Sequence, residues 1–177
     1  MIVWETKHGD MIARHDQLLD VLYEAASGAS LAPVREERHL LPGSAARPGD
    51  LLIRRWADGK DAAIDVTVTV PLARFNVAAA ADEAFNRKVQ GTAQACQDQG
   101  IAFFPVAVET LGGFHRVATE QVKRIGAALA RHQGSDERVA SRQLLQRLSI
   151  TLMRGNAAML MSRRPDNLAP PEVDGRE

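Results

Sequence analysis

The chain has 177 residues, a length that suits one ordinary domain with a hydrophobic core and is short for two. Its 22 Lys and Arg balance 22 Asp and Glu, and a neutral chain is not one that coats nucleic acid indiscriminately. No stretch approaches the ~20 consecutive apolar residues of a membrane span, and the single cysteine, Cys96, excludes an internal disulfide.

The N-terminal half predicts one helix followed by three strands. The helix covers residues 10–27, with Asp10 as its N-cap and Gly28 after its end. The three strands, separated by a Pro- and Gly-rich loop and by a turn centred on Gly59, are Pro33–Leu40, Asp50–Arg54 and Ala63–Val70. In the last of these, the even-numbered positions 64–70 are apolar and the odd-numbered positions 65–69 are polar, so we expect one buried face.

The C-terminal half predicts three helices and one more strand. A helix at Val77–Gln99 ends at Gly100, and the apolar run Ile101–Val108 is typical of a strand buried on both faces. After a turn at Gly112–Gly113, helices follow at 116–132 and 137–162. This order of elements predicts an α/β (α+β) fold, with a central sheet flanked by helices.

Two aspartates carry the main chemical signal. Asp50 opens one predicted strand, and Asp65 lies inside the next, where Asp is disfavoured. Antiparallel strands joined by a short turn bring both carboxylates to one end of the sheet, where they repel each other unless a cation lies between them. Mg²⁺ suits such a pair, because it takes one or two protein carboxylates together with water and phosphate oxygens. The alternative is that both are turn-forming or solvent-facing residues.

The string RPGDLLIRRWADGKDAAIDVTVTVPL, which begins at Arg47, resembles the restriction-like endonuclease domain of site-specific non-long-terminal-repeat retrotransposons. That family has a Pro and a catalytic Asp and then, a dozen or more residues later, Asp-Val-Thr-Val. Arg14-His15-Asp16 resembles its Arg-His-Asn/Asp element, and the run GIAFFPVAVETLGGF resembles the glycine and buried strand that close the domain. The resemblance implies a PD-(D/E)XK nuclease-like, restriction-endonuclease-like core with a mixed sheet and a helical C-terminal extension.

The resemblance also implies the roles of four residues. Asp50 and Asp65 would hold Mg²⁺ or Mn²⁺, Glu36 would assist, and Lys88 would act on the attacking water or on the phosphate. Glu24 and Glu37 compete with Glu36 for the third acidic role.

Helical spacing places Lys88 about 60° from the centre of an apolar stripe. We expect this stripe to contain Phe85, Val89, Thr92 and Cys96. Lys88 would then lie at the margin of the sheet and reach the site with its long side chain. The alternative is a boundary lysine that extends towards solvent.

The first hypothesis that the resemblance implies is a metal-dependent DNA endonuclease. Some residues depart from the family pattern and favour a second hypothesis, a nuclease-fold domain that binds nucleic acid or a protein without cleaving. Gly49 stands between Pro48 and the first aspartate, and Thr67 stands where the wider superfamily has a lysine. No cysteine accompanies His8 and His15, so we expect no zinc site. His15 is therefore interpreted as a helix residue with a local hydrogen bond.

The basic residues are concentrated in the last third of the chain. Residues 114–164 contain ten Lys and Arg against three Asp and Glu, a net charge of +7. Such a region favours contact with the phosphates of duplex DNA, and the residues we expect to bind nucleic acid are Lys123, Arg124, Arg142 and Arg147. The alternative is that these residues solvate exposed helix faces.

These expectations give a domain division. Residues 1–13 form an N-terminal segment, 14–133 the nuclease-like domain, 134–164 a C-terminal helix, and 165–177 a disordered tail. The resemblance implies a reverse transcriptase domain in a longer parent protein as a further partner. The N-terminus lacks the pattern of a secretory signal, so we expect an intracellular protein, nuclear if eukaryotic, with no membrane partner.

Overall fold

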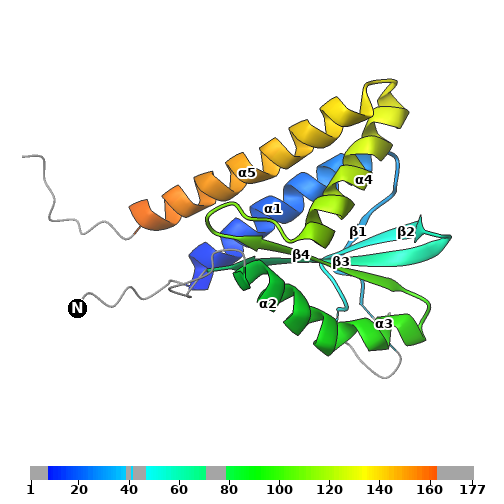
Figure 1. Cartoon of the computed structure of the whole chain (residues 1–177), viewed down its shortest axis with the longest axis horizontal. Coiled ribbons are helices and arrows are strands. Elements are labelled where there is room, and N and C mark those ends of the chain that lie inside the picture. The colour runs from blue at the N-terminus through cyan, green and yellow to red at the C-terminus, as the bar shows by residue number, and fades with distance from the viewer. Residues whose placement is uncertain (1–7, 39–40, 42–46, 71–78, 163–177) are drawn as a thin grey trace, which may run out of the picture.

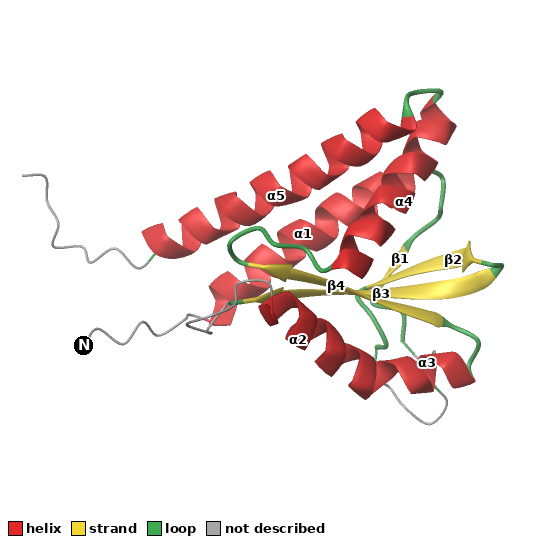
Figure 2. Ribbon diagram, viewed as in Figure 1, coloured by secondary structure: helices red, strands yellow, loops and turns green. Residues whose placement is uncertain are grey.

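The computed structural model describes residues 8–38, 41, 47–70 and 79–162. Its helices are α1 (His8–Gly28), α2 (Ala79–Lys88), the π-helical turn η1 (Val89–Ala93), α3 (Gln94–Asp98), α4 (Arg116–Gln133) and α5 (Glu137–Met161). Its strands are β1 (Val34–Arg35), β2 (Leu51–Ala57), β3 (Lys60–Thr69) and β4 (Ala102–Glu109). Figures 1 and 2 show α1, α4 and α5 on one side of the sheet, and α2 and α3 on the other.

The four strands form one mixed sheet in the order β1-β2-β3-β4. β1 pairs with β2 and β2 with β3 in antiparallel fashion, whereas β3 and β4 are parallel. The turn between β2 and β3 has positive φ at Asp58 and Gly59, as tight hairpins require. The expected α+β class, with a mixed sheet flanked by helices, is thus confirmed.

The two faces of β3 pack against different helices, as its alternating sequence predicts. Ile64 and Val66 are buried with side chains of α1, α4 and α5 in the main core. Ala63 is buried on the other face with Cys96 and Ile101 in a smaller core. Because side chains alternate along a strand, Asp65 lies on the same face as Ala63.

Several predicted boundaries are corrected. α1 begins at His8, so Asp10 lies in its first turn and is not its N-cap. The strand expected at Pro33–Leu40 is limited to Val34–Arg35, and residues 39–40 lie outside the described residues. The last two helices are confirmed to within one residue at each end.

The helix expected at Val77–Gln99 is interrupted by η1, and residues 77–78 lie outside the described part. Lys88 and Cys96 are eight residues apart, so in a regular α-helix their side chains would point about 80° apart around the helix axis. A π turn accommodates one extra residue and reduces this angle to about 20°. Both side chains therefore point towards the sheet. This phase change also alters the predicted apolar stripe, because Ala81 and Ala84 are buried while Phe85, Val89 and Thr92 are only half-buried.

β4 lies at one edge of the sheet, although its apolar sequence predicts burial on both faces. Residues 105–109 are buried, but residues 102–104 are partly exposed. Pro105, which has no backbone N–H to donate, pairs in register with Asp65 at this edge. Burial of β4 along its whole length is therefore a wrong prediction.

α5 belongs to the main core of the described residues. It packs against α1 and α4, and its residues Leu144, Leu148 and Leu152 are buried there. The boundary expected between residues 13 and 14 falls inside α1. No helix of the described part is long and apolar enough to cross a membrane. The tail expected from residue 165 lies outside the described residues.

Candidate metal and catalytic site

The register of the β2–β3 hairpin brings Asp50 beside Asp65. Leu51 pairs with Ile64, so the next position along the antiparallel strands sets Asp50 opposite Asp65. The backbone N–H of Asp50 donates to the carbonyl oxygen of Ile64 at 2.9 Å. The backbone N–H of Val66 donates to Oδ2 of Asp50 at 2.7 Å. Asp50 is thus bonded to both chain neighbours of Asp65.

Gly49 permits this close approach. A Cβ atom at this position would lie 2.8 Å from the carbonyl oxygen of Ile64, a distance that real Cβ atoms essentially never show. The residue between Pro48 and the first aspartate therefore has a steric reason to be glycine. It does not move Asp50 away from Asp65.

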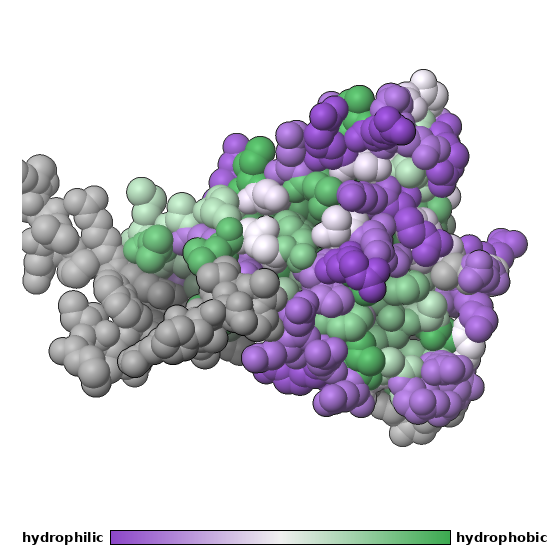
Figure 3. All heavy atoms as spheres, viewed as in Figure 1, coloured by the Kyte–Doolittle hydropathy of each residue, from purple (hydrophilic) through white to green (hydrophobic). Residues whose placement is uncertain are grey.

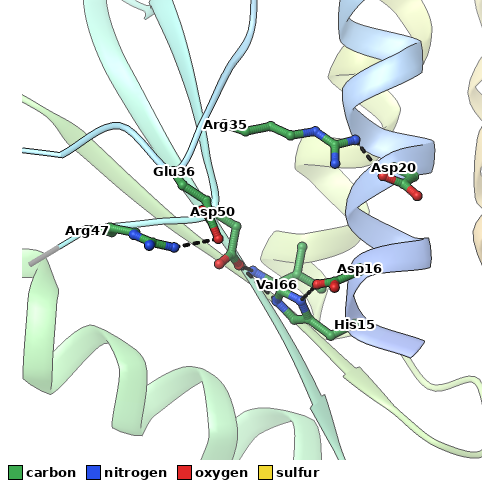
Figure 4. Close-up of polar contacts among 8 residues, drawn as sticks. All are labelled: His15, Asp16, Asp20, Arg35, Glu36, Arg47, Asp50 and Val66. Carbon is green, nitrogen blue, oxygen red and sulfur yellow. Dashed lines mark hydrogen bonds and ion pairs between the residues drawn. The ribbon is translucent and has the colours of Figure 1, made fainter. Parts of the chain in front are cut away.

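His15 reaches Asp50 from α1 (Figure 4). Its Nε2 lies 3.1 Å from Oδ2 of Asp50, and its Nδ1 lies 3.0 Å from Oδ1 of Asp16. The hydrogen bond to Asp50 is the main cause that raises the pKa of His15 to about 9, against the opposing effect of burial; Asp16 raises it further. The interpretation of His15 as a helix residue with a local hydrogen bond is confirmed by its contact with Asp16, and its contact with Asp50 is an additional one that was not predicted.

Lys88 reaches Asp65 from the other side of the sheet. Its Nζ lies 2.9 Å from Oδ2 and 3.1 Å from Oδ1 of Asp65. Ala84 and Ala81, one and two turns before Lys88, are buried, so Lys88 continues the inward-facing line of α2. The prediction that Lys88 reaches Asp65 with its long side chain is thus confirmed, and 39% of that side chain remains exposed.

Burial dominates the electrostatics of Asp65, whose side chain is only 14% exposed. It raises the pKa of Asp65 above the ordinary value, and the charge of Asp50 raises it further. Lys88 and, more weakly, His15 lower this pKa and oppose the shift. The site therefore contains two carboxylates that repel each other, and each contacts a basic side chain, Asp50 that of His15 and Asp65 that of Lys88.

Glu36 adjoins Asp50 through the backbone. Its N–H donates to the carbonyl oxygen of Asp50 at 2.9 Å, and its half-exposed carboxylate lies 2.5 Å from a guanidinium nitrogen of Arg47. Figure 4 shows Glu36, Arg47 and Asp50 together at this end of the strands. The competing acids lie elsewhere, because Glu37 pairs with Arg54 and Glu24 pairs with Arg147 of α5.

The donor set fits Mg²⁺ through its two aspartates. Among the described residues, no group of three or more His, Cys, Asp and Glu side chains is arranged to hold a metal. Mg²⁺ needs only one or two carboxylates, because it retains several water ligands. Oδ2 of Asp65 is buried and makes no hydrogen bond within the described residues in good geometry, although Lys88 lies close enough for an ion pair. That oxygen retains a lone pair that a cation can use.

The site opens along the edge of β3. Within the described residues, β2 pairs with β3 only as far as Leu51 and Ile64, so β3 continues past Asp65 without a partner on that side. A hollow of about 710 Å³ is lined by Lys88 and Thr67, and a second of about 240 Å³ by His15 and Thr67. Both include Met11 of α1. The two hollows therefore reach Lys88 and His15, the basic partners of Asp65 and Asp50, from this edge.

The predicted nucleic-acid-binding residues separate into two places. Lys123, Arg124 and Arg142 line one groove between α4 and α5. Arg147 lies outside that groove and forms an ion pair with Glu24 of α1. The four residues therefore do not line the same groove.

Comparison with protein-family models and with curated proteins gave no match. The chemical character of the site lies in four groups: the facing carboxylates of Asp50 and Asp65, the imidazole of His15 and the ammonium of Lys88. The two carboxylates are ligands of the kind that Mg²⁺ takes, and the ammonium is a positive charge of the kind that stabilises a neighbouring anion.

Proposed function

We propose that the chain is a metal-dependent DNA endonuclease domain with a restriction-endonuclease-like core. The order helix, three antiparallel strands, helix and parallel fourth strand supports this core. One observation carries the proposal: Asp50 stands opposite Asp65 on a hairpin, with Lys88 2.9 Å from Asp65. The sequence resemblance supports an origin in a retroelement, with a reverse transcriptase domain as a partner in a longer parent protein.

Asp50 and Asp65 would hold Mg²⁺ or Mn²⁺, which supplies a bound water of lowered pKa and positive charge beside the scissile phosphate. The Val66 N–H and His15 orient the Asp50 carboxylate. Lys88 places an ammonium group at the open edge, where its charge favours the phosphate as negative charge develops on it. Glu36, held by Arg47, assists by fixing the backbone at Asp50.

A second function, nucleic-acid binding by an inactive nuclease fold, is favoured by a specific observation. Each carboxylate already lies against a basic group of the protein, Asp50 against His15 and Asp65 against Lys88. These contacts balance the two negative charges without a metal. A cation must therefore displace or share these partners to bind.

Nicking of supercoiled plasmid in Mn²⁺ tests the proposal. We expect the wild-type chain to nick, and Asp65→Asn and Lys88→Ala each to reduce the rate by about 100-fold or more, since each removes a charge placed at the reacting phosphate. Lys60→Ala, which removes a lysine from the exposed start of β3, is the matched control and should leave the rate unchanged. A co-purifying nuclease would not respond to Asp65→Asn.

The same experiment decides between the two functions. A wild-type chain that binds DNA but never nicks it, in Mg²⁺ or Mn²⁺, would establish the inactive domain. Equal rates for wild type and Lys88→Ala would remove Lys88 from the mechanism. Far-ultraviolet circular dichroism of each variant shows whether a loss of nicking is a loss of folding.

A further inference from the structure

A groove between α4 and α5 concentrates positive charge away from the candidate catalytic site. It has a volume of about 630 Å³ and an apolar floor at Ala127 and Leu145. Its four basic lining residues are Lys123, Arg124, Arg138 and Arg142. Figure 3 shows hydrophilic side chains gathered over the end of the molecule where these two helices meet, and more hydrophobic ones towards the C-terminal end of α5.

The charges of this groove are not neutralised by carboxylates within the described part of the chain. Elsewhere on the same helices, Arg116, Arg131 and Arg147 each form an ion pair with a glutamate. The four basic residues of the groove form no such pair among the described residues, and the only glutamate that lines it, Glu137, pairs with Arg131. The groove therefore presents an excess of positive charge that calls for an anionic ligand.

The walls of the groove are held in place by close packing. A Cβ atom at Gly126 of α4 would lie 2.6 Å from Cα of Ser141 of α5, so the two helix backbones touch there. Ser141 Oγ also donates to the carbonyl oxygen of Lys123 at 2.9 Å. At one end of the groove, the guanidinium of Arg124 stacks over the ring of Trp56 from β2. The groove is thus formed before any ligand binds, which reduces the entropy lost on binding.

We propose that this groove docks the phosphate backbone of duplex DNA, at a distance along the duplex from the bond that is cut. The inference rests on the proposed function, since it takes DNA as the substrate. Arg138 and Arg142 are four residues apart on α5, about 6 Å along the helix axis, and phosphates follow one strand every ~3.4 Å along the duplex. Their side chains therefore match phosphates one or two nucleotides apart. The catalytic edge is bordered by α1 and α2, so the two contacts lie on different parts of the molecule.

DNA binding by a cleavage-deficient chain tests the groove. The probe is a fluorescent 20-base-pair duplex in the absence of metal, and the background is Asp65→Asn, so that cleavage does not interfere. We expect Arg138→Ala with Arg142→Ala to weaken binding about tenfold or more and to lower the slope of log affinity against log salt by up to about two, because two phosphate contacts are lost. The matched control is Arg116→Ala with Arg154→Ala, which removes the same charge from α4 and α5 outside the groove and should leave the slope near that of the parent.

Three results would overturn the inference. The first is unchanged binding in the groove variant, and the second is an equal loss in the control pair, which would mean attraction by net charge alone. The third is binding of a polyglutamate peptide at this groove with none of the duplex, which would make the partner an acidic protein.

The experiments can contradict the proposal for the groove and the proposal for the catalytic site independently. A wild-type chain that binds DNA through the groove but never nicks would contradict the nuclease and support the groove. Normal nicking together with unchanged DNA binding by the groove variant would do the reverse.

Discussion

His15 connects α1 to the first residue before β2 through its contact with Asp50, across 35 positions of sequence. Its pKa is raised from an ordinary 6.5 to about 9, so the charged form is favoured by folding. The resulting stabilisation is fully present below about pH 6.5 and is lost as the pH rises through about 9. The side chain is partly exposed, so the full shift overstates its effect on stability.

We expect His15→Gln to lower the free energy of unfolding by about 1–2 kcal/mol at pH 6, and the deficit to shrink towards zero near pH 10. Urea denaturation of both chains at pH 6, 8 and 10 measures this. His132→Gln, at the exposed end of α4, is the control. A deficit that is the same at all three pH values would show that His15 acts through packing and not through its charge.

Gly49→Ala should destabilise the chain by about 1–3 kcal/mol, because the new methyl group meets backbone atoms of Ile64 that cannot rotate away. Gly91→Ala provides the contrast, since nothing lies within 4 Å of a Cβ built at Gly91. There, the change should be neutral or stabilising by up to about 1 kcal/mol. Thermal or urea unfolding that gives both variants the same stability would contradict the close approach at Gly49.

The sequence could predict that Asp50 and Asp65 lie close together. An aspartate is unusual inside a β-branched strand, and Gly59 marks the turn of the hairpin that joins the two strands. The sequence could identify Lys88 through the family resemblance. The pairing of His15 with Asp50 and of Glu36 with Arg47 could not be predicted, because each depends on how distant segments pack. The spacing of residues along the sequence does not indicate such contacts.

At the scale of elements, η1 lies between α2 and α3 and keeps the inward-facing sides of both helices turned towards the sheet. Lys88 before it contacts Asp65, and Cys96 after it is fully buried with Ala63 and Ile101. A π turn is an α-helix with one residue too many, so removal of one residue should restore a regular helix in the same phase.

We therefore expect deletion of Gly91 to leave the chain folded with Cys96 protected from a thiol reagent. Insertion of one alanine after Gly91 should turn Cys96 about 80° away from the core and make it reactive, since η1 already accommodates one extra residue. Reaction of the native proteins with a disulfide-based thiol reagent gives the readout. Rapid labelling of the deletion variant would contradict this role of η1.

The helices α4 and α5 could be predicted closely because their ends carry strong local signals. Gly134 adopts a left-handed conformation after α4, and Asp136 caps α5 by accepting from the N–H of Val139. The π turn has no such signal, because the low helical propensity of Gly91 within Val89–Ala93 does not indicate an extra residue in the turn. The edge position of β4 was also hidden, because helices on both faces give an edge strand the same apolar sequence as a central one.

At the scale of the whole molecule, α5 completes the core that α1 and α4 share. Arg14 of α1 donates to Asn156 of α5 at 2.7 Å, and Asn156 donates to the carbonyl oxygen of Thr110 after β4. The sequence predicted a C-terminal helix at residues 134–164, outside the nuclease-like domain. Its apolar positions alone could not reveal which surface they would cover.

A chain that ends at residue 134 should fail to fold cooperatively. Burial of one leucine side chain contributes about 1.5–3 kcal/mol, and the loss of three approaches the whole net stability of a typical domain, about 5–15 kcal/mol. The three are Leu144, Leu148 and Leu152. Urea unfolding followed by circular dichroism measures this, and a sharp transition in the shortened chain would show that residues 8–134 form an independent unit.

The central claim is that Asp50 and Asp65 together accept a divalent cation, in competition with His15 and Lys88. Its most direct test is the free energy of unfolding of the wild type, Asp65→Asn and Asp61→Asn with and without Mn²⁺. At about 100 times its Kd, a cation that binds only the folded chain adds about 2.7 kcal/mol. We predict this gain for the wild type and for Asp61→Asn, whose partly exposed carboxylate pairs with Arg54, and its loss in Asp65→Asn. A wild-type stability that does not change at millimolar Mn²⁺ or Mg²⁺ would contradict the account.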